Sequence, residues 1–213
     1  MSKEVVLSRI VGCGVVAVVR APSGEKLVDV AQALVAGGVE AVEVTFTVPG
    51  APRVMEQVAD RLGAGTVLDP ETARTALLAG AQFIVSPTVN RKVIRLCRRY
   101  DKAVMPGALT PTEVLTAWEA GADIVKVFPS DFTGPSYLKV LHGPLPHVRL
   151  LPTGGVTLQT VADFIRAGAC AVGVGGNLVE AKAVAAGDMA RIESLARQFV
   201  DIIKKTRRPT QPA

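Results

Sequence analysis

The sequence has little histidine and cysteine, and these shortages argue against whole classes of chemistry. Only two histidines occur among 213 residues, His142 and His147, and neither lies in an H-x-x-x-H pattern or among carboxylates, so a zinc site or a histidine base has little support. Three cysteines, Cys13, Cys97 and Cys170, form an odd number without C-x-x-C spacing. They indicate small core residues of a reduced, cytoplasmic protein rather than a disulfide framework. We therefore expect a protein that holds no metal.

Long apolar runs are missing as well. No run reaches the ~18 residues of a membrane span, so we expect a soluble protein with no membrane partner. The segment 10–19 is similar to the apolar part of a signal peptide, but Glu4 and Arg9 precede it, Arg20 closes it and no A-x-A site follows. We interpret residues 10–19 as a buried strand.

Few aromatic residues and an uneven distribution of charge argue against nucleic-acid binding. Aromatic residues make up 4% of the chain, and four of the five net positive charges come from the tail KKTRRPTQPA. We expect a nearly neutral domain over residues 1–203, a basic and disordered tail over 204–213, and no nucleic-acid partner.

The sequence does have ample apolar material and a recurring phrase. Hydrophobic residues make up 49% of the chain, which is enough for one large core. The phrase joins a helix-ending glycine to a short apolar strand, and it occurs as AGGVEAVEV, AGAQFIVS, AGADIVKV and AGACAVGV. Further strands are predicted between these, at residues 15–19, 65–68, 103–105 and 149–152. The two sets together predict eight strands.

Helical patterns fill the intervals between the strands. They cover residues 25–35, 52–61, 70–78, 92–99, 111–119 and 158–166. Several have proper starts, with Ser23 or Asp69 before the first turn and Thr110 with Glu113 in a capping-box arrangement. Short strands that are apolar on both faces and alternate with helices predict a parallel sheet, and eight such units predict an α/β fold of the closed (β/α)₈ barrel type, with a short N-terminal helix.

A lysine interrupts one of the apolar strands, in the stretch IVKVFP at residues 124–129. Burying an ammonium group costs roughly several kcal/mol unless the group is paired or loses its proton. Strand alternation places Glu43, Thr45 and Thr47 on the lumen side of their strand, and Arg20 ends the first strand. Because barrels carry their chemistry at the C-terminal ends of the strands, we expect Lys126, Glu43 and Arg20 to converge at one mouth.

The lysine and the glutamate suit carbonyl chemistry. Apolar surroundings disfavour the charged form of an amine, and a neutral amine can form a Schiff base with a carbonyl substrate. Glu43 can then carry protons as general acid and base. A tight ion pair would hold the amine in its charged form, so we expect a water or a substrate hydroxyl between the two groups. A buried Lys126–Glu43 pair that only ties two strands together, or an outward-facing lysine, remains the alternative.

Glycines and threonines near the strand ends suit a phosphorylated substrate. Gly154 and Gly155 in PTGGV follow the seventh strand, and the segment GVGGN at 173–177 ends the eighth. Glycines at these positions let backbone N–H groups approach a phosphate. Threonines at positions 45, 47, 66 and 153 can line a polar pocket for a carboxylate and hydroxyls, although threonine is also ordinary in strands.

These residues together resemble the bacterial 2-keto-3-deoxy-6-phosphogluconate (KDPG) aldolases, also called 4-hydroxy-2-oxoglutarate aldolases. The resemblance extends over residues 15–179 and is carried, in order, by ALVAGGVEAVEVTF, GAGTVLDP, AGAQFIVSP, MPG, KVFP and PTGGV. It implies a homotrimeric barrel that cleaves KDPG, an intermediate of the Entner–Doudoroff pathway, to pyruvate and D-glyceraldehyde 3-phosphate without a metal or other cofactor. Lys126 matches the Schiff-base lysine, and Glu43 matches the acid/base glutamate.

The resemblance also implies binding roles. Thr66 matches a threonine that helps to bind the pyruvate carboxylate, Phe128 an aromatic residue beside the imine, and Pro87 a residue that borders the pocket. The phosphate loops match Gly154, Gly155, Gly175 and Gly176.

The sequence departs from the family pattern in two places. Many members carry an arginine at the position of Thr47, where it contacts the pyruvate carboxylate; members that read T-F-T-V-P often have an arginine that ends the first strand, here Arg20. Our hypothesis is that Arg20 supplies the missing cation. The second departure is Asn177, where many members have serine. Asn177 and Thr153 occupy positions that touch the distal hydroxyls or the phosphate, and the threonine before the glycines favours the gluconate substrate over the galactonate one.

Other functions stay open at this point. The protein could cleave 2-keto-3-deoxy-6-phosphogalactonate, or also accept unphosphorylated 4-hydroxy-2-oxoglutarate. It could belong to another class of phosphate-binding barrel, such as an epimerase or a thiamin-phosphate type synthase. A non-catalytic oligomeric barrel scaffold is the non-enzyme alternative.

Overall fold

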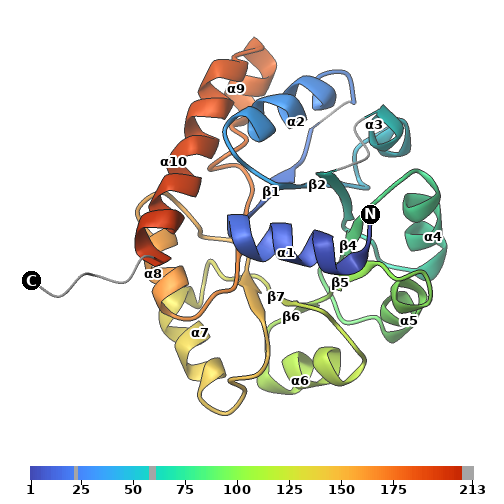
Figure 1. The fold of residues 1–213 in the computed structure, drawn as a ribbon, viewed down its shortest axis with the longest axis vertical. Helices are drawn as coiled ribbons and strands as arrows, with labels where there is room; N and C mark the ends of the chain where they lie inside the picture. Colours follow the sequence, from blue (N-terminus) through green and yellow to red (C-terminus); the bar gives the residue numbers. More distant parts are fainter. Residues whose placement is uncertain (22–23, 58–60, 208–213) are drawn as a thin grey trace, which may run out of the picture.

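A computed structural model describes residues 1–21, 24–57 and 61–207, and its parallel strands curl into a barrel enclosed by helices (Figure 1). One sheet has the strand order β5-β4-β3-β2-β1-β9, and a second has the order β6-β7-β8. A bridge between Thr153 and Gly173 connects β8 to β9. β5 runs into β6 across Pro106, whose carbonyl accepts a hydrogen bond from the Lys126 amide. These two links close the barrel, as the sequence predicts.

The strands are short and buried along their whole length. They are β1 Val15–Val19, β2 Ala41–Thr45, β3 Leu62–Gly65, β4 Phe83–Val85, β5 Ala103–Met105, β6 Gly107–Ala108, β7 Val125–Val127, β8 Leu150–Pro152 and β9 Val172–Val174. The helices are α1 Lys3–Cys13, α2 Leu27–Ala36, α3 Ala51–Gln57, α4 Pro70–Leu78, α5 Arg91–Arg99, α6 Pro111–Glu119, α7 Gly134–His142, α8 Val161–Arg166, α9 Ala181–Ala186 and α10 Met189–Arg207. In the described part of the chain no helix is both long and apolar enough to cross a membrane.

The third strand is not where the sequence predicts it. The sequence predicts a strand at residues 65–68, whereas the strand occupies Leu62–Gly65. A side chain at Gly63 would overlap the ring of Phe83, and one at Gly65 would overlap the carboxylate of Glu43. The barrel therefore needs glycine in this strand, and packing overrides β propensity. Thr66, with φ +58°, ends the strand.

Several predicted helix boundaries also change. Residues 10–13 belong to α1, and the strand interpreted as 10–19 begins at Val15, because Gly14 in the left-handed conformation ends the helix. α2 starts at Leu27 rather than at residue 25, and its predicted cap, Ser23, lies outside the described residues. α8 starts at Val161 rather than at residue 158. The predicted caps Asp69 and Thr110 do begin α4 and α6, the latter with the predicted capping box.

The C-terminal helix extends into the region predicted as a disordered tail. α10 continues to Arg207, so residues 204–207 are helical, and 208–213 lie outside the described residues. The Arg207 guanidinium donates hydrogen bonds to the carbonyls of Val11, Gly12 and Cys170. These bonds satisfy carbonyls at the end of α1 and stabilise the last turn of α10.

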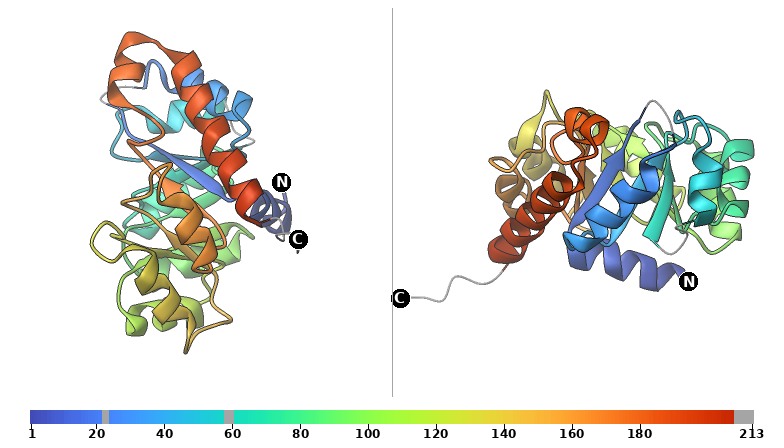
Figure 2. Two further views of the ribbon diagram at one scale, coloured as in Figure 1. Left: turned by 90° about the vertical axis from the view of Figure 1, so that its left-hand side faces the viewer. Right: turned by 90° about the horizontal axis from the view of Figure 1, so that it is seen from above.

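Two apolar clusters position the mouth of the barrel. The larger fills the space between the strands and the surrounding helices, and Val42 and Val44 belong to it. The smaller lies in the lumen, where Val6 and Ile10 of α1 pack with Phe83 and Ile124. Figure 2 shows α1 lying across this end of the barrel. Because α1 and its apolar layer close the N-terminal end, the polar residues of the lumen are left to the opposite, C-terminal end.

Candidate active site

Lys126 and Glu43 meet in the lumen, directly above the apolar layer. Lys126 of β7 lies two residues after Ile124 and shares its lumen-facing side, and Glu43 lies on the lumen face of β2. Their side chains are almost completely buried, with exposed fractions of 5% for Lys126 and 3% for Glu43. Lys126 Nζ lies 4.0 Å from Glu43 Oε1. The structure thus places the two residues together, as strand alternation predicts.

The pair is in contact but is not hydrogen-bonded. A separation of 4.0 Å exceeds the ~3.2 Å limit of an ordinary N–H···O bond. Lys126 Nζ also lies 5.1 Å from the centre of the Phe128 ring, within the range of a cation–π contact. Each polar group therefore keeps bonding capacity for a third partner, and an aromatic ring shields one side of the amine.

The carboxyl group of Glu43 is held partly toward its neutral form. Burial raises the pKa of Glu43 above its ordinary value, and the nearby charges of Lys126 and Arg20 oppose that rise. A carboxyl group with a raised pKa holds its proton to a higher pH than usual, which suits a group that must both donate and accept a proton. The site therefore contains a proton carrier beside an amine.

A cavity of about 420 Å³ opens at the C-terminal ends of β1, β7, β8 and β9. Lys126 does not line it, but Phe128, whose ring centre lies 5.1 Å from Lys126 Nζ, does. Eight of the predicted site residues line it: Arg20, Phe128, Thr153, Gly154, Gly155, Gly175, Gly176 and Asn177. The Thr153 hydroxyl is buried and has no hydrogen-bond partner among the described residues. Asn177 donates from Nδ2 to the Val156 carbonyl. The lining of this cavity therefore combines the guanidinium group of Arg20, the free hydroxyl of Thr153 and the two glycine loops.

The remaining predicted residues lie at other strand ends, outside this cavity. Thr47 is exposed and its hydroxyl is 3.0 Å from that of Thr45. Thr66 follows β3 in the left-handed region, which a β-branched residue rarely occupies. Pro87 follows β4, and its backbone packs against Gly107. The structure gathers Lys126, Glu43 and the residues of the cavity, and it places these three farther round the mouth.

The sequence reasoning missed one polar residue of the cavity. Asp131 is exposed, and its carboxylate packs against Gly154 in the PTGGV loop. Its neighbour Ser130 is buried and donates from its backbone amide to the Thr153 carbonyl. Asp131 follows the K-x-F-P motif by only two residues. Because that motif ends at the barrel mouth, the sequence position of Asp131 could have indicated that it lies there too.

The cysteines do not take part in this site. All three are free, and Cys13 and Cys97 are buried. Burial raises the pKa of Cys97 to about 12 and that of Cys170 to about 11, so both thiols stay protonated at neutral pH. In the described ranges, no group of three or more His, Cys, Asp or Glu side chains is arranged to hold a metal ion.

Comparison with known proteins identifies the family. Residues 6–195 match the family described as KDPG and KHG aldolase. The 2-dehydro-3-deoxy-phosphogluconate aldolase of Treponema pallidum is 37% identical, over 89% of this chain and 93% of the relative. The 2-dehydro-3-deoxy-6-phosphogalactonate aldolase of Escherichia coli is 34% identical, over 92% of this chain and 96% of the relative.

A solved structure of the same family agrees with the fold. KDPG aldolase from Legionella pneumophila, with pyruvate captured as a covalent carbinolamine intermediate, superimposes with a TM-score of 0.83 at 26% identity, covering 91% of this chain and 97% of that one. The barrel, the buried lysine and the matches in sequence and structure agree: the chain belongs to the KDPG and KHG aldolase family of class I aldolases.

Proposed function

We propose that this protein cleaves 2-keto-3-deoxy-6-phosphogluconate to pyruvate and D-glyceraldehyde 3-phosphate through a Schiff base on Lys126. The observation that carries the proposal is the placement of the Lys126 amine in the lumen, 4.0 Å from a carboxylate oxygen of Glu43. An amine in a closed mouth, with a proton carrier beside it, is what carbinolamine formation and dehydration require.

Lys126 and Glu43 divide the reaction between them. The neutral amine of Lys126 attacks the C2 carbonyl, and Glu43 donates the proton with which the carbinolamine hydroxyl leaves as water. The Glu43 carboxylate then accepts the C4 hydroxyl proton while the C3–C4 bond breaks. The electron pair of that bond passes into the enamine as the aldehyde leaves. Protonation of C3 by Glu43 and hydrolysis of the imine release pyruvate and restore both groups. The raised pKa of Glu43 supports this double use.

The surrounding residues would hold the two ends of the substrate. Arg20 and Thr66 are the proposed partners of the pyruvate carboxylate, with Thr47 and Pro87 bordering that side. The phosphate would lie on the glycine loops, where Gly154, Gly155, Gly175 and Gly176 leave backbone N–H groups open to it, beside Asn177. Phe128 lies beside the imine, and the free hydroxyl of Thr153 would bond a substrate hydroxyl. Support comes from the cavity of about 420 Å³, which Arg20, Phe128 and Thr153 line together with the glycine loops.

The choice among related substrates is part of the proposal. Relatives named for the phosphogluconate and for the phosphogalactonate substrate are 37% and 34% identical to this chain. We assign the gluconate configuration because Thr153 precedes the glycines, and we expect weaker cleavage of 4-hydroxy-2-oxoglutarate, which shares the pyruvate half. The protein would act as a homotrimer in the cytoplasm, without a metal or other cofactor.

Trapping of the covalent intermediate tests the proposal. The protein is incubated with pyruvate and borohydride, and the reduced adduct is located by peptide mass spectrometry, with Lys126→Met and the surface variant Lys139→Met run in parallel. A single adduct on Lys126, present in Lys139→Met and absent in Lys126→Met, is expected. Scattered adducts on surface lysines, or none, would return Lys126 to the role of a structural partner for Glu43.

Substrate assays then separate the remaining alternatives. Pyruvate release is measured with the gluconate and the galactonate substrate and with 4-hydroxy-2-oxoglutarate, and native mass spectrometry gives the oligomeric state. A higher kcat/KM for the galactonate substrate would overturn the assigned configuration. A stable oligomer without lyase activity on any of the three would favour the scaffold alternative.

A further inference from the structure

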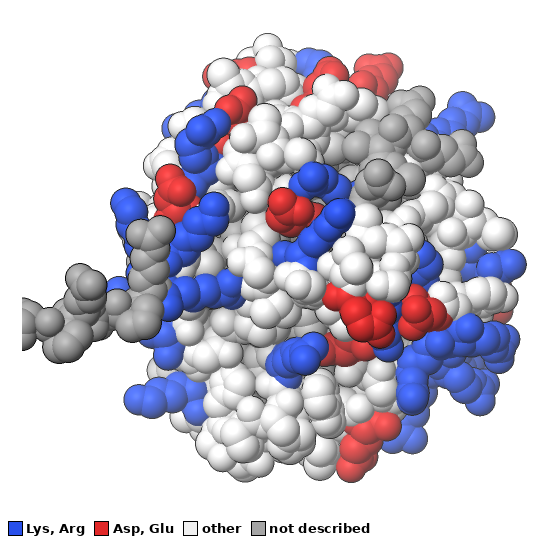
Figure 3. All heavy atoms as spheres, in the orientation of Figure 1, with Lys and Arg blue, Asp and Glu red and all other residues white. Residues whose placement is uncertain are grey.

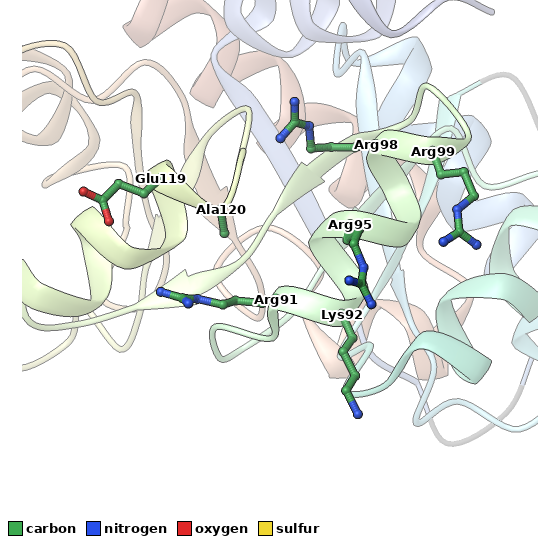
Figure 4. Close-up of a pocket in the computed structure, with 7 residues that line it drawn as sticks. All are labelled: Arg91, Lys92, Arg95, Arg98, Arg99, Glu119 and Ala120. Atoms are coloured by element: carbon green, nitrogen blue, oxygen red, sulfur yellow. The ribbon is translucent and has the colours of Figure 1, made fainter.

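A second and larger hollow lies on the outside of the barrel, away from Lys126. It has a volume of about 930 Å³ and is bounded by α5 and by the C-terminal end of α6. Its lining residues are Arg91, Lys92, Arg95, Arg98, Arg99, Glu119 and Ala120 (Figure 4). The hollow shares no residue with the cavity at the barrel mouth. We call it the α5 groove.

The α5 groove is strongly cationic. Five Lys or Arg side chains and one carboxylate, that of Glu119, line it. Figure 4 shows Arg91 and Arg98 extending from α5 toward Glu119 and Ala120, while the other three cations lie along the remainder of the helix. Figure 3 shows blue side chains gathered at the lower right of the molecule, over the position of α5 in Figure 1. Such a concentration of one sign in a hollow focuses potential on it.

These cations have no partner among the described residues. Over the described residues, none of the five forms an ion pair or a side-chain hydrogen bond, whereas Arg61, Arg191 and Arg197 on other helices and loops each pair with a glutamate. Arg98 also lies against Gly121, where a side chain would collide with its guanidinium group. The backbone just beyond α6 therefore makes room for Arg98.

Helix stability accounts for only part of this charge pattern, because Arg98 and Arg99 suit the C-terminal turn of α5 whereas the other three cations do not. Arg91 and Lys92 occupy the first turn of α5, which has no acidic residue, and positive charge at a helix N-terminus is unfavourable. Arg95 stands four residues from both Arg91 and Arg99, and like charges at this spacing destabilise a helix. The helix carries repulsion that a bound anion would relieve.

We propose that the α5 groove binds a small anion with several phosphate groups. Arg91, Arg95 and Arg98 follow one another along one stripe of the helix at intervals of about 4–6 Å, from a rise of 1.5 Å per residue. Guanidinium groups bind phosphate oxygens in bidentate fashion, so the stripe suits neighbouring phosphates on one ligand. The volume of about 930 Å³ is of the size that small-molecule sites have.

The chemistry of the lining selects this class over two other polyanions. Among the described residues that line the groove there is no aromatic side chain on which a nucleobase could stack, a feature that single-stranded nucleic-acid sites use. The cations are exposed and line an open hollow between α5 and the end of α6, and this concave shape fits a compact anion better than a flat bilayer surface. The anion is therefore expected to be compact and rich in phosphate.

Calorimetric titration with inorganic tripolyphosphate tests the proposal on the full chain. We compare the wild type with Arg91→Gln/Arg95→Gln/Arg98→Gln and with a control of equal charge loss, Lys139→Gln/Lys204→Gln/Lys205→Gln, whose residues are exposed on α7 and α10. The α5 variant is expected to lose about tenfold or more in affinity, since several charge-assisted hydrogen bonds are removed, and the control to lose little. Orthophosphate should bind more weakly than tripolyphosphate.

Cleavage activity and thermal unfolding serve as separate readouts. Both triple variants should keep the wild-type kcat/KM, because none of their residues lines the mouth, and the α5 variant should unfold at the wild-type temperature or above it. Three results would overturn the proposal: no binding by the wild type, an equal loss of affinity in the control, or binding that survives in the α5 variant and competes with substrate. Tighter binding of a single-stranded oligonucleotide than of tripolyphosphate would also overturn it and assign the groove to nucleic acid.

Discussion

Lys126 and Glu43 face one another across the barrel from strands that are not neighbours. β7 and β2 are separated by β8, β9 and β1 on one side, so the 4.0 Å approach of Lys126 Nζ to Glu43 Oε1 spans the lumen. Removing two ionisable groups from water in this way is expensive, and replacing such a pair by apolar residues is often neutral or stabilising. The pair is therefore better explained by chemistry than by stability.

Glu43→Gln tests whether this carboxyl group carries protons. An amide keeps the shape and burial of the side chain but cannot exchange protons, so kcat should fall by about 10²–10⁴-fold. The Schiff base on Lys126 should still form, more slowly. Pyruvate release gives kcat, and NMR follows the exchange of pyruvate methyl protons with deuterium. Glu71→Gln, at an exposed position of α4, is the control, and an unchanged exchange rate in Glu43→Gln would remove Glu43 from the mechanism.

Arg20→Met tests whether the arginine that ends β1 replaces the cation absent at Thr47. Loss of a charge-assisted hydrogen bond to the carboxylate should raise the KM for pyruvate about tenfold or more, with little change in soluble yield. Lys139→Met, an exposed charge on α7, should leave KM as it is. Steady-state condensation kinetics measure both, and an Arg20→Met enzyme with the wild-type KM would end the hypothesis.

The pH profile gives an independent test of the same arginine. Burial raises the pKa of Glu43, so the carboxylate that accepts the C4 hydroxyl proton forms only above that raised value, and activity should fall as the pH drops through it. The positive charge of Arg20 lowers the pKa of Glu43. Arg20→Met should therefore shift the acid limb of the kcat profile to higher pH, whereas Lys139→Met should not. A shift to lower pH would contradict the electrostatic argument.

The sequence predicts the centre of this site well because strand alternation has a fixed period. A residue two positions from Ile124 must share its face, so the lumen positions of Lys126 and Glu43 follow once the strands are placed. β3 escapes that reasoning because Gly63 and Gly65 are required by Phe83 and Glu43, which lie far away in sequence. The α5 groove escapes it as well, since its second wall comes from α6. Alternation is a local property, whereas room for a side chain and the shape of a hollow depend on tertiary packing.

Gly65→Ala and Gly63→Ala should separate the chemical from the structural need for glycine in β3. A methyl group at Gly65 meets the carboxylate of Glu43, which can move aside, so kcat should fall more than stability does. A methyl group at Gly63 meets the fully buried ring of Phe83, so the free energy of unfolding should fall by about 1–3 kcal/mol. Urea denaturation and kcat are measured for both. Equal effects of the two variants on both quantities would contradict this division.

Thr66 and Asp101 share an unusual backbone conformation, but only Thr66 lies at the barrel mouth. Their φ values are +58° and +50°, in the left-handed region that favours glycine, and such strain costs about 1–3 kcal/mol. Replacement by glycine relieves the strain but gives the unfolded chain more freedom, so the free energy of unfolding should change by less than about 1 kcal/mol in Thr66→Gly and in Asp101→Gly.

The two variants should differ in substrate binding. Thr66→Gly removes the hydroxyl proposed to bind the pyruvate carboxylate and should raise the KM for pyruvate, while Asp101→Gly, beyond the end of α5, should not. Thr66→Ser keeps the hydroxyl and should keep most of the affinity. If Thr66→Gly and Thr66→Ser raise KM equally, the hydroxyl is not the binding group, and the strain at Thr66 serves only to end β3.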